Sequence, residues 1–155
     1  MAIEIERKFL VKVDRLPRLE NGLRIVQAYI PTANGTTVRV RLAGEKAYLG
    51  VKSVASGISR REYEYAIPME DAQEMLREVC LAAAIEKQRF FFPQGEVTWE
   101  IDVFNGENNG LIVAEVELQS EGQLLTLPDW IAEEVTMDPR FGNHSLARNP
   151  YSTWE

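Results

Sequence analysis

Residues 3–11 read IEIERKFLV, and apolar and charged side chains alternate through this segment. A β-strand sends successive side chains to opposite faces, so one face would carry isoleucine and phenylalanine while the other carries Glu4, Glu6 and Lys8. A single strand of this kind would normally turn its charged face to solvent. The pattern becomes decisive because it returns along the chain.

The same alternation predicts seven further strands, over residues 23–30, 36–42, 46–52, 60–67, 85–92, 96–104 and 111–119. The third strand along the chain shows it most clearly, since Arg39 and Arg41 oppose a row of valine and leucine. Short turns separate most of the segments, including Asn-Gly pairs at 34–35 and 105–106. Asparagine and glycine adopt positive φ readily, so these turns predict antiparallel neighbours.

One helix is expected after Pro68, where apolar side chains recur at helical spacing. Its apolar stripe comprises Ala72, Met75, Leu76, Val79 and Cys80. A second helix is predicted over residues 128–135, and the tail over 136–155 should be rich in turns, with at most a short helix over 143–148. We expect the helices and the tail to cover the apolar faces of the strands.

If the apolar faces are covered from outside, the charged faces must point inward. We therefore predict a mainly β (α+β) fold, an eight-stranded antiparallel β-barrel that closes into a tunnel with a charged interior and a few covering helices. The interior acids would be Glu4, Glu6, Glu62, Glu64, Glu100, Asp102, Glu115 and Glu117. The interior bases would be Lys8, Arg39, Arg41, Lys52, Arg60, Lys87 and Arg89. Such groups are costly to bury unless they pair or bind ions, so a salt-bridged structural barrel is the alternative to a site for a charged ligand.

The interior charges suit a polyphosphate and a hard metal ion. Arginine donates in a forked geometry and lysine supplies a point charge, so the candidate substrate-binding residues are Lys8, Arg39, Arg41, Lys52, Arg60, Lys87 and Arg89. Carboxylates two residues apart place oxygen ligands side by side, which suits Mg²⁺ or Mn²⁺ rather than zinc. The candidate metal ligands are Glu4, Glu6, Glu115 and Glu117, with Glu62 and Glu64 supporting a second ion or its water. Glu100 and Asp102 could bind metal or only pair with interior cations.

The sequence shows no Ser-His-Asp set, Walker loop or G-x-G-x-x-G run, so metal-assisted attack by water is the simplest reaction. His144 lies in the tail outside any ligand cluster, and we interpret it as a capping or surface residue. The single Cys80 excludes an internal disulfide and agrees with a cytoplasmic protein.

Composition agrees with one domain over residues 1–155, since 45% hydrophobic residues can fill one sizeable core. The net charge is −7, with 17 Lys and Arg against 24 Asp and Glu, and no basic run lies outside the predicted interior. Nucleic acid is therefore not an expected partner. No apolar stretch reaches transmembrane length and the acidic start is unlike a signal peptide, so no membrane partner is expected either.

The opening Glu4-x-Glu6-x-Lys8 resembles the E-x-E-x-K signature of the CYTH superfamily, also called the triphosphate tunnel metalloenzymes. The resemblance continues in order through Arg39-Val40-Arg41, Lys52, Arg60-Arg61-Glu62-Tyr63-Glu64, Lys87-Gln88-Arg89, Glu100-Ile101-Asp102, Ala114-Glu115-Val116-Glu117-Leu118, Asp138 and Asn143-His144-Ser145-Leu146-Ala147. One E-x-E-x-K alone is a weak signal, but the ordered set spans essentially the whole chain. It implies an eight-stranded antiparallel tunnel that binds a triphosphate group and a divalent metal.

The chain looks like the short bacterial inorganic triphosphatase type, which implies hydrolysis of tripolyphosphate to pyrophosphate and phosphate. The alternatives are a class IV-type adenylate cyclase, an organic (thiamine or nucleoside) triphosphatase and a polyphosphate-binding module without catalysis. The resemblance also implies a lysine–tyrosine pair, so Lys8 and Tyr29 are the candidate catalytic residues. Lys8 would contact the scissile end of the substrate and Tyr29 would orient it, unless Tyr29 only fills the tunnel mouth. A homodimer is compatible with the sequence.

Overall fold

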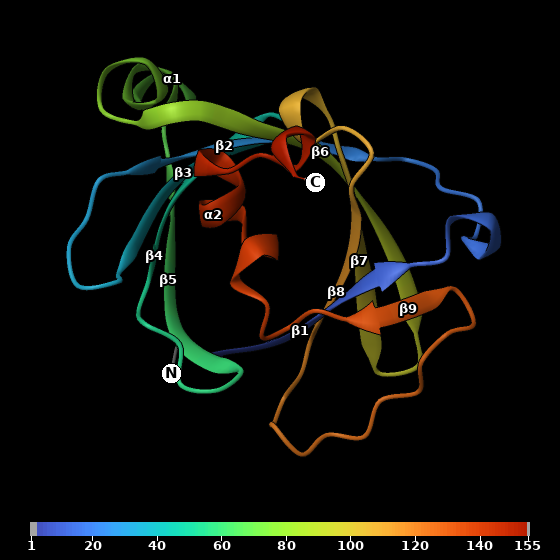
Figure 1. Cartoon of the computed structure of the whole chain (residues 1–155). Helices are drawn as coiled ribbons and strands as arrows, with labels where there is room; N and C mark the ends of the chain where they lie inside the picture. Colours follow the sequence, from blue (N-terminus) through green and yellow to red (C-terminus); the bar gives the residue numbers. More distant parts are fainter. Residues whose placement is uncertain (1–2, 155) are drawn as a thin grey trace.

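The strands form one antiparallel sheet that closes into a ring (Figure 1). The computed structural model describes residues 3–154; residues 1, 2 and 155 of the predicted domain lie outside the described part. The strands are β1 (Ile3–Val11), β2 (Leu23–Ile30), β3 (Thr37–Ala43), β4 (Lys46–Lys52), β5 (Ser59–Ile67), β6 (Leu81–Gln94), β7 (Val97–Phe104), β8 (Ile112–Glu117) and β9 (Ile131–Glu134). Their order is β5-β4-β3-β2-β6-β7-β8-β1-β9, and β5 also pairs with β1. The predicted closed eight-stranded barrel is therefore confirmed.

A ninth strand replaces the helix that the sequence predicted over residues 128–135. β9 pairs with β1, where Phe9 lies opposite Glu134 and Val11 lies opposite Ile131. The apolar residues of this segment are compatible with a helix, but the free edge of β1 offers backbone partners that a helix could not use. Trp130 and Ile131 are buried against the outside of the barrel. The segment therefore covers the outer apolar face as predicted, but it does so as a strand and not as a helix.

The barrel closes over a short seam between β1 and β5. Only Ile3, Glu4 and Ile5 of β1 are register partners of β5, because β9 takes the same edge of β1 further along. Between these two pairings, single hydrogen bonds replace a regular ladder: the Glu6 amide donates to the Ile58 carbonyl at 3.3 Å, and the Lys8 amide donates to Thr136 Oγ1 at 3.0 Å. Another depression lies at this seam, lined in part by Ala55, Gly57, Ile58 and residues 136–139.

The outer apolar faces are covered on two sides. Helix α1 (Met69–Glu78) packs on β3 and β4, where Ala72 is buried with Val40 and Ala47. Val79, which the sequence placed in the apolar stripe, is 46% exposed because the helix ends one residue before it. On the other side, Trp99 packs edge-on against Trp130 with ring centroids 5.6 Å apart. No helix in residues 3–154 is long and apolar enough to cross a membrane.

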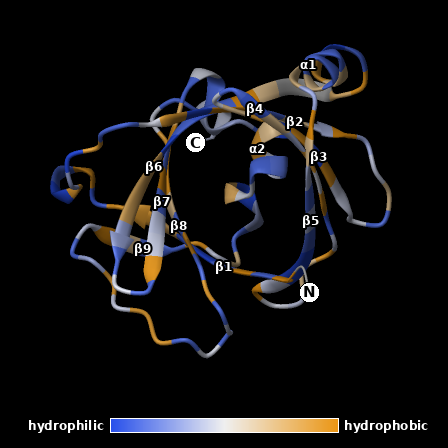
Figure 2. Ribbon diagram, turned by 180° about the vertical axis from the view of Figure 1, so that it is seen from behind, coloured by the Kyte–Doolittle hydropathy of each residue, from blue (hydrophilic) through white to orange (hydrophobic). Residues whose placement is uncertain are grey.

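Helix α2 (Asn143–Arg148) lies inside the ring, as both views show (Figures 1 and 2). The expectation that the tail would cover only outer faces is therefore wrong for this helix. Leu146 joins Phe141 in a buried cluster with Tyr29 and Phe104, and Phe104 lies on the same strand face as the inward-facing Asp102. The interior thus has an apolar end filled by the tail and a charged part beside it. Short 3-10 turns, Val13–Arg15, Gly106–Asn108, Pro139–Phe141 and Tyr151–Thr153, complete the chain.

Candidate active site

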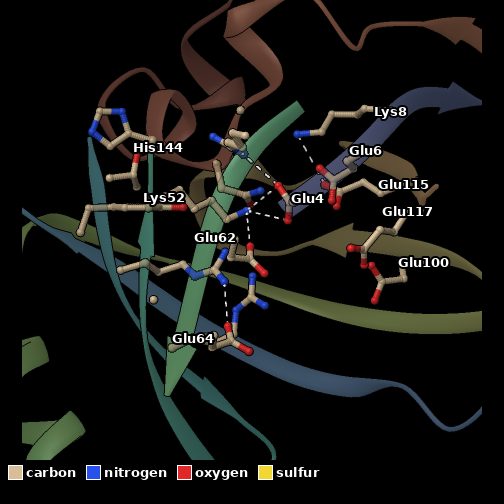
Figure 3. A pocket seen from close by; sticks show the side chains of 18 of the residues that line it. Glu4, Glu6, Lys8, Lys52, Glu62, Glu64, Glu100, Glu115, Glu117 and His144 are labelled. Atoms are coloured by element: carbon tan, nitrogen blue, oxygen red, sulfur yellow. Dashed lines mark hydrogen bonds and ion pairs between the residues drawn. The ribbon is translucent and has the colours of Figure 1, made fainter. Parts of the chain in front are cut away.

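The charged part of the barrel interior is a cavity of about 210 Å³ (Figure 3). Every predicted site residue except Lys87 lines it: Glu4, Glu6, Lys8, Tyr29, Arg39, Arg41, Lys52, Arg60, Glu62, Glu64, Arg89, Glu115 and Glu117. Each side chain projects inward because strand alternation places it on the inner face of its strand. Residues that are far apart in sequence therefore meet in one small space.

One wall of the cavity, formed by β1 and β8, is acidic. Glu6 lies opposite Glu117 in the β1–β8 ladder, and Figure 3 shows them gathered with Glu100 and Glu115. Burial, and then the neighbouring Glu115 and Glu4, raise the pKa of Glu6 well above its ordinary value. Burial and Glu4 also raise the pKa of Glu117. Neither Glu6 nor Glu117 forms an ion pair with a cation among the described residues, whereas Glu115 lies 3.5 Å from Lys8 Nζ and Glu100 lies 3.4 Å from Arg89 Nη1.

The carboxylates nearer β5 are compensated by protein cations. Lys52 Nζ lies 3.2 Å from Glu4 and 3.1 Å from Glu62, and Arg60 Nε lies 3.2 Å from Glu4. Burial raises the pKa of Glu4, but Lys52, a hydrogen bond with Glu62 and Arg60 outweigh it and lower the pKa to about 2. Burial and the hydrogen bond with Glu4 raise the pKa of Glu62. Glu4 is therefore the ionised partner of this pair.

The opposite wall carries the arginines of β3. Arg39 Nη2 lies 3.1 Å from Glu64. Arg41 has no ion pair with a carboxylate within the described part of the chain, and its Nε donates to Gln27 Oε1 at 2.8 Å. Burial, followed by repulsion from Arg39 and Arg89, lowers the pKa of Arg41 to about 10. A half-buried guanidinium crowded by other cations, without a carboxylate partner, is well suited to bind an anion.

Lys87 lies behind the cavity wall. Its side chain is fully buried, and Nζ contacts Asp102 Oδ2 at 2.8 Å and Asn143 Oδ1 at 3.1 Å. Arg89 does reach the cavity while it holds Asp102 through two hydrogen bonds of 2.8 and 2.9 Å. Burial outweighs the attraction of Asp102 and lowers the pKa of Lys87 to about 8. Asp102 thus pairs with interior cations, and Lys87 connects it to the first residue of α2.

The two predicted catalytic residues line the same cavity without touching each other. Lys8 Nζ lies 3.5 Å from Glu115 and donates to the Phe141 carbonyl at 3.2 Å. Burial opposes the charge of Lys8, but Glu115 and Glu6 outweigh it and raise its pKa. The hydroxyl of Tyr29 accepts from Gln27 Nε2 at 3.1 Å. Among the described residues, no hydrogen bond joins Lys8 to Tyr29.

Sequence reasoning missed the residues that the tail and β2 bring to the site. His144 was interpreted as a capping or surface residue, but it lines the cavity and packs edge-on against Tyr29 at 5.2 Å. The cap position of α2 is Gly142 instead. Gln27 shares the inner face of β2 with Tyr29 and is fully buried. The inward parity of Gln27 was visible in the sequence, but its lack of charge drew attention away from it.

The carboxylates are suited to a divalent metal, although they are not preassembled around one. Among residues 3–154, no three Asp, Glu, His or Cys side chains converge as a ready-made metal site. Glu6 and Glu117 nevertheless supply hard oxygen donors, and neither forms an ion pair among the described residues. Mg²⁺ and Mn²⁺ prefer such donors, so the residues present fit these ions.

Comparison with known proteins places the chain in a family. The CYTH domain model matches residues 2–147, and the chain therefore belongs to the CYTH family. A protein of Acetivibrio thermocellus named inorganic triphosphatase is 46% identical over 155 residues, which cover 100% of this chain and 99% of the relative. An inorganic triphosphatase of Nitrosomonas europaea is 37% identical over 149 residues, covering 93% and 96%. The crystal structure of the inorganic triphosphatase NE1496 superposes with a TM-score of 0.67 at 34% identity, covering 95% of each chain.

Proposed function

We propose that this protein hydrolyses inorganic triphosphate to pyrophosphate and phosphate inside the barrel, with a divalent metal ion. The observation that carries the proposal is that one small cavity holds two carboxylates without an ion-pair partner, Glu6 and Glu117, on one wall and the unpaired guanidinium of Arg41 on the other, among the described residues. The first wall suits a metal and the second suits a phosphate chain. Full-length similarity to relatives named inorganic triphosphatase supports the same reaction.

In the proposed reaction, the residues of the cationic wall bind and orient the phosphate chain. Arg39, Arg41 and Arg89 would donate to phosphate oxygens and stabilise charge as it moves toward the leaving pyrophosphate. The oxygen of a water molecule forms a bond to a terminal phosphorus, and the bridging P–O bond to pyrophosphate breaks. Lys8 lies beside Glu115 at the same end of the cavity as Glu6 and can contact the terminal phosphate there.

Glu6, Glu115 and Glu117 would hold the metal, and Glu4, Glu62 and Glu64 would support it or a second ion. When bound, Mg²⁺ or Mn²⁺ would neutralise negative charge on the phosphates and lower the pKa of a coordinated water molecule. Glu4 and Glu62 already share Lys52, so they are less available than Glu6 and Glu117, which form no ion pair among the described residues. We therefore propose the β1–β8 wall as the principal metal site.

The cavity favours an inorganic substrate over a nucleotide. Most of its lining residues are charged, and Tyr29 and His144 are the aromatic side chains that the described residues contribute to it. Both rings are engaged with each other, which leaves little for a nucleobase to stack on. The class IV-type adenylate cyclase and the organic triphosphatase remain the alternative functions, because they too bind a triphosphate group.

Steady-state assays with tripolyphosphate, pyrophosphate, ATP and thiamine triphosphate, each with Mg²⁺ and with Mn²⁺, test the proposal. We expect kcat/KM to be highest for tripolyphosphate, because pyrophosphate would leave buried cations without partners. If cyclic AMP were the main product from ATP, the protein would be an adenylate cyclase and the proposal would be wrong. Binding of tripolyphosphate without turnover under every condition would indicate a binding module.

Arg41→Ala is expected to lower kcat/KM for tripolyphosphate by about tenfold to a hundredfold, since hydrogen bonds to charged groups are worth about 1.5–3 kcal/mol. KM should rise and kcat should fall, because the same guanidinium binds the substrate and the developing charge. The matched control is Arg61→Ala, which removes an exposed arginine from β5. Equal kinetics for the two variants would show that Arg41 does not contact the substrate.

We further propose the cytoplasm as the compartment, which agrees with the unpaired Cys80. A homodimer stays a prediction from the sequence. Sedimentation at several protein concentrations would test it.

A further inference from the structure

The side-chain amide of Gln27 forms hydrogen bonds through both its oxygen and its nitrogen. Its side chain is fully buried, with Arg41 opposite it in the β2–β3 ladder and Tyr29 two residues along the same strand face. Arg41 Nε lies 2.8 Å from Gln27 Oε1, and Gln27 Nε2 lies 3.1 Å from the Tyr29 hydroxyl. A neutral residue therefore joins two polar groups that line the cavity.

The direction of each hydrogen bond in this chain is fixed by chemistry. A guanidinium can only donate, so the group of Gln27 that faces Arg41 must be the carbonyl oxygen. The NH₂ of the amide then has to face Tyr29 and donate to it. The oxygen and the nitrogen of the Gln27 amide are therefore assigned by their partners.

Two consequences follow for the cavity. The Nε of Arg41 is occupied, which holds the plane of the guanidinium and leaves both terminal nitrogens for an anion. The Tyr29 oxygen accepts from Gln27, so its own hydrogen must point elsewhere, and Tyr29 lines the cavity. No other hydrogen bond of this hydroxyl occurs among the described residues, so its hydrogen is free for a ligand.

We infer that Gln27 is a positioning residue that presents Arg41 and Tyr29 to the triphosphate as pure hydrogen-bond donors. This inference rests on the proposed function, since a polyphosphate only accepts hydrogen bonds from such groups. A carboxylate in place of the amide would give the opposite arrangement. It would pair with the Arg41 charge and would accept the hydrogen of Tyr29, turning it away from the substrate.

Gln27→Glu is the most informative variant, because it keeps the shape and the acceptor for Arg41 but reverses the direction of the hydrogen bond with Tyr29. Binding of tripolyphosphate, measured by calorimetry with EDTA present so that anion binding is seen without metal, should weaken about tenfold or more. Gln88→Glu is the matched control, since it adds the same charge at an exposed position of β6. Gln27→Met, which keeps the length and removes both hydrogen bonds, should also raise KM.

A double-mutant cycle with Tyr29→Phe separates positioning from simple packing. In the wild-type background, loss of the hydroxyl should lower kcat/KM about tenfold. In the Gln27→Glu background it should have almost no further effect, because the hydroxyl already points away from the substrate. Equal effects of Tyr29→Phe in both backgrounds, or unchanged tripolyphosphate binding in Gln27→Glu, would overturn the inference.

The inference can fail separately from the proposed function. If the wild type neither binds nor hydrolyses tripolyphosphate, the proposed function is wrong. The hydrogen bond between Gln27 and Arg41 can still be measured by NMR in that case. The Nε–H proton of Arg41 should exchange slowly with water in the wild type and rapidly in Gln27→Met. Wild-type turnover with normal kinetics in both Gln27 variants would leave the function standing and reject the role of Gln27.

Discussion

Glu6→Gln should lower kcat/KM for tripolyphosphate by about a thousandfold, which corresponds to about 4 kcal/mol of transition-state stabilisation. The substitution keeps the shape of the side chain and removes the charge that a metal requires. Glu6 forms no ion pair among the described residues, and the nearby Lys8 and Lys52 do not offset the effect of its burial, so its charge is the one that a bound ion would neutralise. Mn²⁺ binding, followed by calorimetry, should be lost together with activity.

The loss in Glu6→Gln should come without loss of stability. Burial raises the pKa of Glu6, so the ionised carboxylate is unfavourable in the folded protein, and a neutral amide avoids this cost. The Tm measured in EDTA should therefore be no lower than that of the wild type. Glu133→Gln removes an exposed carboxylate from β9 and serves as the control. Undiminished Mn²⁺ affinity in Glu6→Gln would move the metal site away from the β1–β8 wall.

Asp102→Asn is expected to lower the free energy of unfolding at neutral pH by about 3–5 kcal/mol, the usual cost of breaking a buried ion pair. Asp102 is fully buried and contacts both Lys87 and Arg89 at 2.8 Å. The amide would leave these two buried cations without their shared carboxylate. Denaturation with urea, followed by circular dichroism, measures the change. Asp129→Asn, at an exposed position, is the control.

The pH dependence of this effect has a defined sign. Burial raises the pKa of Asp102, but Lys87 and Arg89 outweigh burial and hold it below the ordinary value of 3.8. The stability that the ionised carboxylate contributes is thus present above pH 3.8 and is lost as the pH falls through the lower, folded-state value. The difference between Asp102→Asn and the wild type should shrink on acidification below pH 3.8. A difference that stays constant at low pH would contradict the ion-pair explanation.

Strand alternation predicted the fold and the inner face of the barrel because it depends only on local geometry. The parity of Glu4, Glu6 and Lys8 in one strand says which side of the sheet they occupy. Parity does not say how deep a side chain lies along the barrel. Lys87 lies on the same inner face of its strand as Arg89. It does not line the cavity, however, because the tail fills that end of the interior and Lys87 contacts Asn143 there.

The errors came from contacts between segments that are distant in sequence. The apolar residues of the segment that forms β9 are compatible with a helix. The segment forms a strand because it can pair with the edge of β1. The placement of α2 inside the ring likewise depends on inward-facing apolar residues such as Phe104, which alternation alone would assign to a charged interior. Gln27 has the inward parity of Tyr29, but it is uncharged, and its link between Arg41 and Tyr29 depends on the pairing of β2 with β3.

The position of α2 inside the barrel also has a consequence for the order in which the protein is made. The strands of the ring end at Glu117, whereas Phe141, Asn143 and His144 follow β9. Since synthesis proceeds from the N-terminus, the ring of strands leaves the ribosome before the segment that fills its apolar end. Until that segment arrives, Lys8 lacks its carbonyl partner and Lys87 lacks Asn143. The cavity is therefore completed by residues that are translated after all the strands of the ring.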